Sequence, residues 1–87
     1  MATVTVKIQG MKFVPDKLTI KAGDSVVWKN TGNMPHTATA DKGQGPVPDT
    51  GDINPGGSSS PQVFAAAGTV KYHCEIHTSM HGEVTVS

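Results

Sequence analysis

Apolar and polar residues alternate with a period of two along most of this chain, and this pattern constrains the fold more than any other feature. The alternation runs through residues 3–8, 17–21, 25–29, 69–74 and 83–86. Successive side chains of a strand point to opposite faces of a sheet, so each run predicts a strand with one buried face. An apolar period of 3.6 residues, which would indicate an amphipathic helix, nowhere persists for ten residues. The sequence therefore predicts an all-β protein.

The segments between these runs are rich in turn-forming residues. Gly, Pro, Asn and Asp cluster at residues 15–16, 22–24 and 30–33, as turns require. Residues 41–61 form a longer polar stretch, which we interpret as a loop crossing between two sheets rather than a lid over a substrate. A chain of 87 residues has room for one core. We expect residues 1–87 to form a single domain, a Greek-key β-sandwich of about seven or eight strands.

The charge balance restricts the partners of this protein. Seven lysines balance seven acidic residues, and arginine is absent. This neutral balance argues against nucleic acid and anionic membranes as partners. Membrane insertion is not expected either, because no apolar run approaches transmembrane length. The first residues lack the basic and apolar regions of a signal peptide, which fits both a cytosolic protein and a mature exported one.

The residue types that carry chemistry lie near the single cysteine. Cys74 is followed by His77 and Met80 at intervals of three residues, and His36 follows the run that contains Trp28. Thiolate and thioether sulfur are soft ligands that favour Cu(I), and imidazole suits both Cu(I) and Cu(II). Two histidines, one cysteine and a weak axial methionine make a blue-copper site. The sequence therefore predicts one type 1 copper ion held by His36, Cys74, His77 and Met80.

Neighbouring residues provide alternatives to this assignment. His81 adjoins Met80 and is a rival axial donor, although a surface position near the site is the simpler interpretation. His73 alternates with Cys74 and is expected to face the other way. Trp28 and Tyr72 are expected to belong to the core rather than to an electron relay.

Several short motifs make the chain similar to the cupredoxins, closest to the amicyanin and plastocyanin group. The two-residue gap between His77 and Met80 resembles that of amicyanin. The resemblance implies an eight-stranded Greek-key sandwich with the four predicted ligands at one end, and a periplasmic or other extracytoplasmic location. The other motifs that carry it are Phe13-Val14-Pro15, residues 22–30, Pro35-His36-Thr37 and Tyr72-His73-Cys74.

Two departures from the family pattern bear on the predicted site. The family commonly has proline before the second histidine, where this chain has Ile76. We expect the Ile76 N–H to donate to the Cys74 sulfur, which would stabilise the thiolate of the reduced site and raise its potential. Thr37 stands where the family often has asparagine, and its hydroxyl is expected to bind the Glu75 backbone.

The predicted function is electron transfer by a monomer that is not an enzyme. A redox donor and acceptor are expected to dock near His77, on an apolar patch of Met34, Pro35 and Ile76. The alternative is a copper storage or delivery protein without redox turnover, which would use the same ligands. A Cys–His hydrolase is disfavoured, because the tight Cys74–His77 spacing does not readily place a general base and an oxyanion hole. Zinc is chemically possible at such a site, and we interpret it as mis-metallation.

Overall fold

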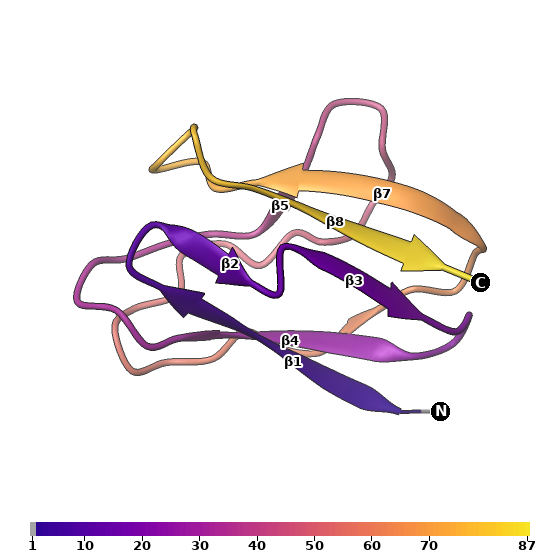
Figure 1. Ribbon diagram of the computed structural model, residues 1–87, viewed down its shortest axis with the longest axis horizontal. Coiled ribbons are helices and arrows are strands. Elements are labelled where there is room, and N and C mark those ends of the chain that lie inside the picture. The colour runs from indigo at the N-terminus through magenta and orange to yellow at the C-terminus, as the bar shows by residue number, and fades with distance from the viewer. Residues whose placement is uncertain (1) are drawn as a thin grey trace.

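The computed structural model describes residues 2–87 and shows two four-stranded sheets packed face to face (Figure 1). The first sheet has the order β2-β1-β4-β6 and the second β3-β8-β7-β5. The strands are β1 (Thr3–Gln9), β2 (Lys12–Val14), β3 (Lys17–Ile20), β4 (Ser25–Asn30), β5 (Thr39–Ala40), β6 (Gln62–Val63), β7 (Gly68–His73) and β8 (His81–Val86). None of residues 2–87 belongs to a helix long and apolar enough to cross a membrane. The predicted all-β sandwich is confirmed.

Each sheet mixes parallel and antiparallel pairs. β1 lies parallel to β4, with Val6 opposite Trp28, and antiparallel to β2. β8 lies antiparallel to β7 and parallel to β3. The chain therefore passes repeatedly from one sheet to the other, so that residues far apart in sequence meet at each end of the sandwich.

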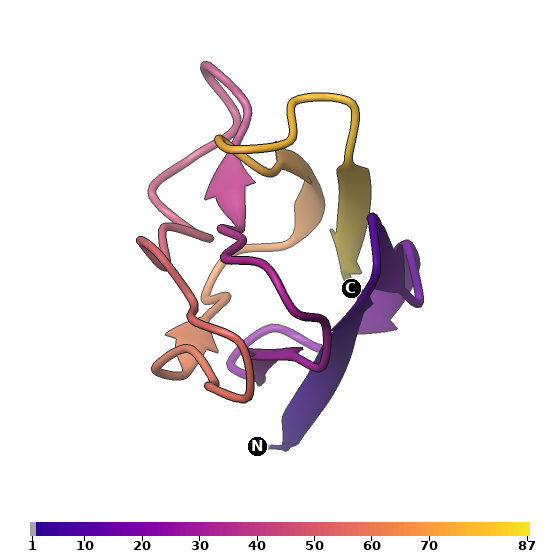
Figure 2. The ribbon, with the colours of Figure 1, turned by 90° about the vertical axis from the view of Figure 1, so that its left-hand side faces the viewer.

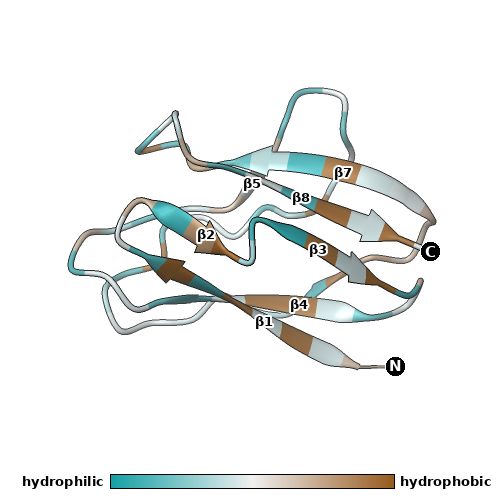
Figure 3. Cartoon of the chain, viewed as in Figure 1, coloured by the Kyte–Doolittle hydropathy of each residue, from teal (hydrophilic) through white to brown (hydrophobic). Residues whose placement is uncertain are grey.

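The core follows directly from the alternation of apolar and polar residues. Figure 3 shows apolar and polar bands succeeding one another along the strands. Trp28 and Tyr72 lie between the sheets and are 0% and 1% exposed. The Trp28 Nε1–H donates to Tyr72 Oη over 3.2 Å, and the Phe13 ring packs edge-on against Tyr72. Burial raises the pKa of Tyr72 to about 12. Both aromatic residues are core residues, as predicted.

Three short strands were not predicted from the sequence. β2, β5 and β6 have three residues or two, too few for alternation to be recognised. The polar segment 41–61 runs from β5 in the second sheet to β6 in the first, which confirms a crossover between sheets. Isolated bridges tie this segment to the rest of the fold, joining Ile53 to His36 and Ser58 to Lys29.

One end of the sandwich brings two loops together, at the left of Figure 1. The first follows β4 and leads to His36, and the second, residues 74–80, joins β7 to β8. Figure 2 looks onto this end. Cys74 directly follows β7, so it is positioned by a strand that is hydrogen-bonded on both edges.

Candidate metal centre

The 74–80 loop is closed by its own main chain. The Cys74 N–H donates to the Met80 carbonyl over 3.2 Å, and the Met80 N–H donates to the His77 carbonyl over 2.9 Å. Cys74 is fully buried, Met80 is 3% exposed and His77 is half-buried. The loop therefore presents Cys74 and His77 from a compact turn and buries Met80 within the same segment.

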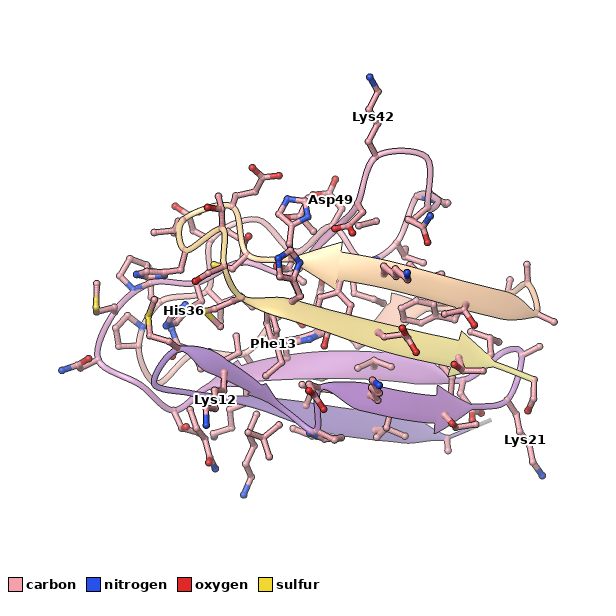
Figure 4. The ribbon with its side chains drawn as sticks, turned by 45° about the horizontal axis from the view of Figure 1, so that its top comes forward. Lys12, Phe13, Lys21, His36, Lys42 and Asp49 are labelled. Carbon is pink, nitrogen blue, oxygen red and sulfur yellow. The ribbon has the colours of Figure 1, made fainter. Side chains whose placement is uncertain are left out.

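His36 is positioned by a separate pair of hydrogen bonds. Its N–H donates to the Ile53 carbonyl over 3.1 Å, and the Ile53 N–H donates back over 2.7 Å. The imidazole is 1% exposed and lies between the sheets at the loop end, as Figure 4 shows. Burial lowers the pKa of His36, and the neighbouring His77 lowers it further. The ring is therefore neutral near pH 7, with a nitrogen lone pair available for a metal.

Three side-chain donors meet at one point. His36 Nδ1 and His77 Nδ1 lie 3.1 Å apart, and Cys74 Sγ lies 3.7 Å from the first and 4.0 Å from the second. Bonds of about 2.0 Å to nitrogen and about 2.3 Å to sulfur place such donors roughly 3.3–3.7 Å apart around one ion. The three distances fit a single small metal ion within a few tenths of an ångström. Two imidazoles with one thiolate are the donor set that copper prefers.

Two backbone N–H groups point at the Cys74 sulfur. They belong to Thr37, at 3.3 Å, and to His77, at 3.4 Å. The expectation for Ile76 is not met: its N–H makes no bond to the sulfur in the described part of the chain, because the turn directs the next amide there instead. Both observed bonds stabilise negative charge on sulfur, which favours the reduced form of a thiolate–metal site.

Thr37 ties the two loops together, as predicted. Its hydroxyl oxygen accepts the Glu75 N–H over 2.8 Å, while its own N–H donates to Cys74. Thr37 is buried, so these bonds are shielded from water. Thr37 therefore links the His36 segment to the Cys74 segment by two hydrogen bonds, one to the Cys74 sulfur and one from the Glu75 N–H.

Comparison with known proteins assigns the family. The sequence model of one protein family, the copper-binding proteins of the plastocyanin/azurin family, matches residues 1–87. The chain belongs to this family. It is a cupredoxin, with copper as its cofactor and electron transport as its function.

The relatives of this cupredoxin include plastocyanins and amicyanins. Plastocyanin of Vicia faba is 32% identical over 89 residues, covering 90% of each chain. Amicyanin-alpha of Methylorubrum extorquens is 38% identical over 82 residues, covering 93% of this chain and 69% of the relative. The crystal structure of amicyanin from Paracoccus versutus superposes with a TM-score of 0.84 at 32% identity, covering 98% of this chain and 81% of that one. The resemblance to the cupredoxins is thus confirmed.

Asn30 is a buried residue of this cupredoxin whose role sequence reasoning missed. Its Nδ2 donates to the carbonyls of Met34 and Ile53 over 2.7 and 2.9 Å, and its Oδ1 accepts the Gly32 N–H over 2.9 Å. These bonds fix the loop that carries His36. The available signal was a polar residue at an inward position, since Val26, Trp28 and Asn30 share one face of β4.

The other two histidines lie away from the three donors. His73 points to the opposite face of β7 and contacts Asp41 and Glu75, while His81 is exposed at the start of β8. Both positions agree with the sequence-based expectation. The hydrogen bond to Asp41 raises the pKa of His73, burial opposes this rise, and Glu75 adds to it.

Proposed function

We propose that this cupredoxin transfers electrons through a copper ion that His36, Cys74 and His77 would hold, with Met80 as the fourth ligand. The observation that carries the assignment is the convergence of two imidazole nitrogens and one sulfur within 4.8 Å of one another. Bound copper would supply one-electron chemistry by alternating between Cu(I) and Cu(II). Met80 is buried in the same loop as Cys74 and His77, whereas its rival His81 is exposed outside it.

The surrounding residues restrict movement of the donors. Cys74 follows a strand, His36 is fixed by the exchange of hydrogen bonds with Ile53, and Thr37 joins the two segments. Donors fixed in this way rearrange little when the charge at the site changes. Electron transfer is fast only when this rearrangement is small. The proposed function therefore follows from the rigidity of the loop end as well as from the donor types.

Addition of Cu(II) to the metal-free protein should produce an intense absorption band in the red. The band arises from thiolate-to-copper charge transfer, so we expect it to be absent in Cys74→Ser. A mild reductant should bleach the band and reoxidation should restore it, which a storage or delivery protein does not require. A pale complex, or one with the same spectrum in Cys74→Ser, would show that Cys74 is not a ligand.

We further propose that redox partners dock on the apolar surface around His77. Met34 and Ile76 are 47% and 44% exposed. Pro35, next to Met34 in the chain, is also exposed, and His77 is half-buried. Met11, 48% exposed, extends this apolar surface from the β1–β2 turn beside Ser79 and Met80. Transient redox complexes bury little surface, so a few apolar side chains suffice. We expect the electron to leave through the His77 imidazole, because His77 is half-buried whereas the other three proposed ligands are buried.

Ile76→Lys should slow electron self-exchange between oxidised and reduced protein by roughly tenfold, about 1.4 kcal/mol in activation free energy. Self-exchange brings two such surfaces together, and the substitution buries a charge in each. The rate should be measured by NMR line broadening in 1 M salt, where charge repulsion at a distance is screened. Val63→Lys, at a 53% exposed residue on β6, is the matched control. An unchanged rate in Ile76→Lys would place the docking surface elsewhere.

The proposal includes three further properties: a periplasmic or other extracytoplasmic location, a monomeric state and the lack of enzymatic activity. The buried Cys74 supports the last of these. Its sulfur has no exposed surface and faces two imidazoles, an arrangement suited to metal ligation rather than to attack on a substrate. The family resemblance supports the location.

A further inference from the structure

A second group of metal-binding residue types lies on the outer face of β7 and β8. Cross-strand pairs line this face: Thr69 opposite Thr85, Lys71 opposite Glu83, and His73 opposite His81. The Thr69 and Thr85 hydroxyl oxygens lie 3.4 Å apart, as expected for side chains on the same face. The histidine pair ends the row, at the edge nearest the 74–80 loop. It faces away from Cys74, whose side chain points into the core.

His73 lies between two carboxylates. Its Nδ1 is 2.6 Å from Asp41 Oδ1, and its Nε2 is 3.0 Å from Glu75 Oε1. The backbones of both acidic residues are fixed. The Asp41 N–H donates to the Lys71 carbonyl over 2.9 Å, and the Glu75 N–H donates to the Thr37 hydroxyl. The backbones that carry the two carboxylates are therefore held in place beside His73, although the Glu75 side chain itself is exposed.

This arrangement matches the surroundings of a metal-binding histidine. Such a histidine usually donates its second ring N–H to a carboxylate, which fixes the ring and the tautomer. Asp41 stands in that position at Nδ1. The other nitrogen, Nε2, then faces Glu75 Oε1 at 3.0 Å. Two donors on one ion, with bonds of about 2.1 Å, lie roughly 3.0–3.4 Å apart.

His81 lies opposite His73 on the facing strand β8. Cys74 and Met80 form a hydrogen-bonded pair at the ends of the two strands, because the Cys74 N–H donates to the Met80 carbonyl. Hydrogen-bonded and non-hydrogen-bonded pairs alternate along antiparallel strands, so the next pair, His73 and His81, is a non-hydrogen-bonded one. The Cβ atoms of such pairs lie about 4.5–5.5 Å apart. His81 is exposed, so its ring is free to turn toward Nε2 of His73. Cross-strand imidazoles at this separation can bind the same ion.

We propose that His73 Nε2, the Glu75 carboxylate and the His81 imidazole form a second metal site, oriented by Asp41 and distinct from the copper centre. Imidazole with carboxylate selects borderline divalent transition ions such as Zn²⁺ or Cu²⁺. Because His73 and Glu75 flank Cys74 in the chain, the bound ion lies close to the copper ligands. A divalent charge there disfavours Cu(II) relative to Cu(I), so occupation of the second site raises the potential of the first.

The test titrates the oxidised, copper-loaded protein with Zn²⁺ in a calorimeter. We expect one Zn²⁺ to bind per chain while the visible band stays intact, which shows that copper has not been displaced. His73→Gln and His81→Gln should each weaken Zn²⁺ binding at least tenfold. Asp41→Asn, which leaves all three proposed ligands in place, should weaken it 10–100-fold, as loss of an orienting carboxylate does. Glu75→Gln should weaken it too.

Glu83→Gln is the matched control, because Glu83 lies on the same face of β8 opposite Lys71. It should leave Zn²⁺ affinity unchanged. The copper potential should rise with Zn²⁺ in the parent protein and remain constant in His73→Gln. The visible band reports that each variant is folded. If no Zn²⁺ binds, or if it binds with the same affinity in both histidine variants, the proposal is wrong.

Discussion

Gly82→Ala should destabilise the fold by about 3 kcal/mol, at the upper end of the cost of overpacking a core. A Cβ added at Gly82 would lie 2.3 Å from Tyr72 Cζ and 2.4 Å from Tyr72 Oη. The tyrosine cannot move aside, because it is 1% exposed and packed against Phe13 and Trp28. In a domain of this size the loss lowers the melting temperature by roughly 12–24 °C. Thermal unfolding by circular dichroism measures it.

Whether Gly82→Ala lowers or raises the free energy of unfolding is informative, because the backbone at Gly82 does not require glycine. Its φ angle lies outside the left-handed region, so the substitution would otherwise stabilise the protein by about 0.4–1 kcal/mol through the unfolded state. Only the Tyr72 ring opposes it. In a Tyr72→Leu background the additional cost of Gly82→Ala should therefore largely vanish. A neutral or stabilising effect in the parent protein would contradict the proposed packing of β8 over Tyr72.

Asn30→Asp should destabilise the protein by about 3 kcal/mol or more at pH 7, because it buries a charge without a partner. The Asn30 amide nitrogen donates to the Met34 and Ile53 carbonyls. In Asn30→Asp a carboxylate oxygen, which cannot donate, would take the place of this nitrogen and repel both carbonyl oxygens. The substitution keeps the shape of the side chain, so packing changes little. Urea unfolding at several pH values measures the loss. The penalty should shrink as the pH falls and the introduced carboxyl becomes protonated.

Asn33→Asp is the matched control, since it makes the same chemical change at an exposed residue three positions away. It should alter the free energy of unfolding by less than about 0.5 kcal/mol. Asn30→Asp should also weaken copper binding, because Ile53 exchanges two backbone hydrogen bonds with His36. Equal effects of the two substitutions would show that Asn30 does not fix the loop that carries His36.

The sequence by itself was sufficient to predict the fold class and the donor types. Five of the eight strands are long enough for alternation to appear, and alternation depends only on the two-residue repeat of an extended chain. The spacing of Cys74, His77 and Met80 is likewise local, because a strand end and a short turn constrain it. The opposite orientation of His73 follows from the same repeat. Thr37 could be placed beside Glu75 only through the resemblance to the cupredoxins.

The tertiary structure decided every feature that joins distant segments. The short strands β2, β5 and β6 exist because neighbouring strands offer them hydrogen bonds, not because of their own sequence. The second donor to the Cys74 sulfur is the amide of His77 and not that of Ile76, since turn geometry sets where each N–H points. The role of Asn30, the crowding at Gly82 and the Asp41–His73 contact each depend on side chains from different strands or loops. Local periodicity carries no information about such contacts, because they arise only when strands pair within a sheet or when the two sheets pack together.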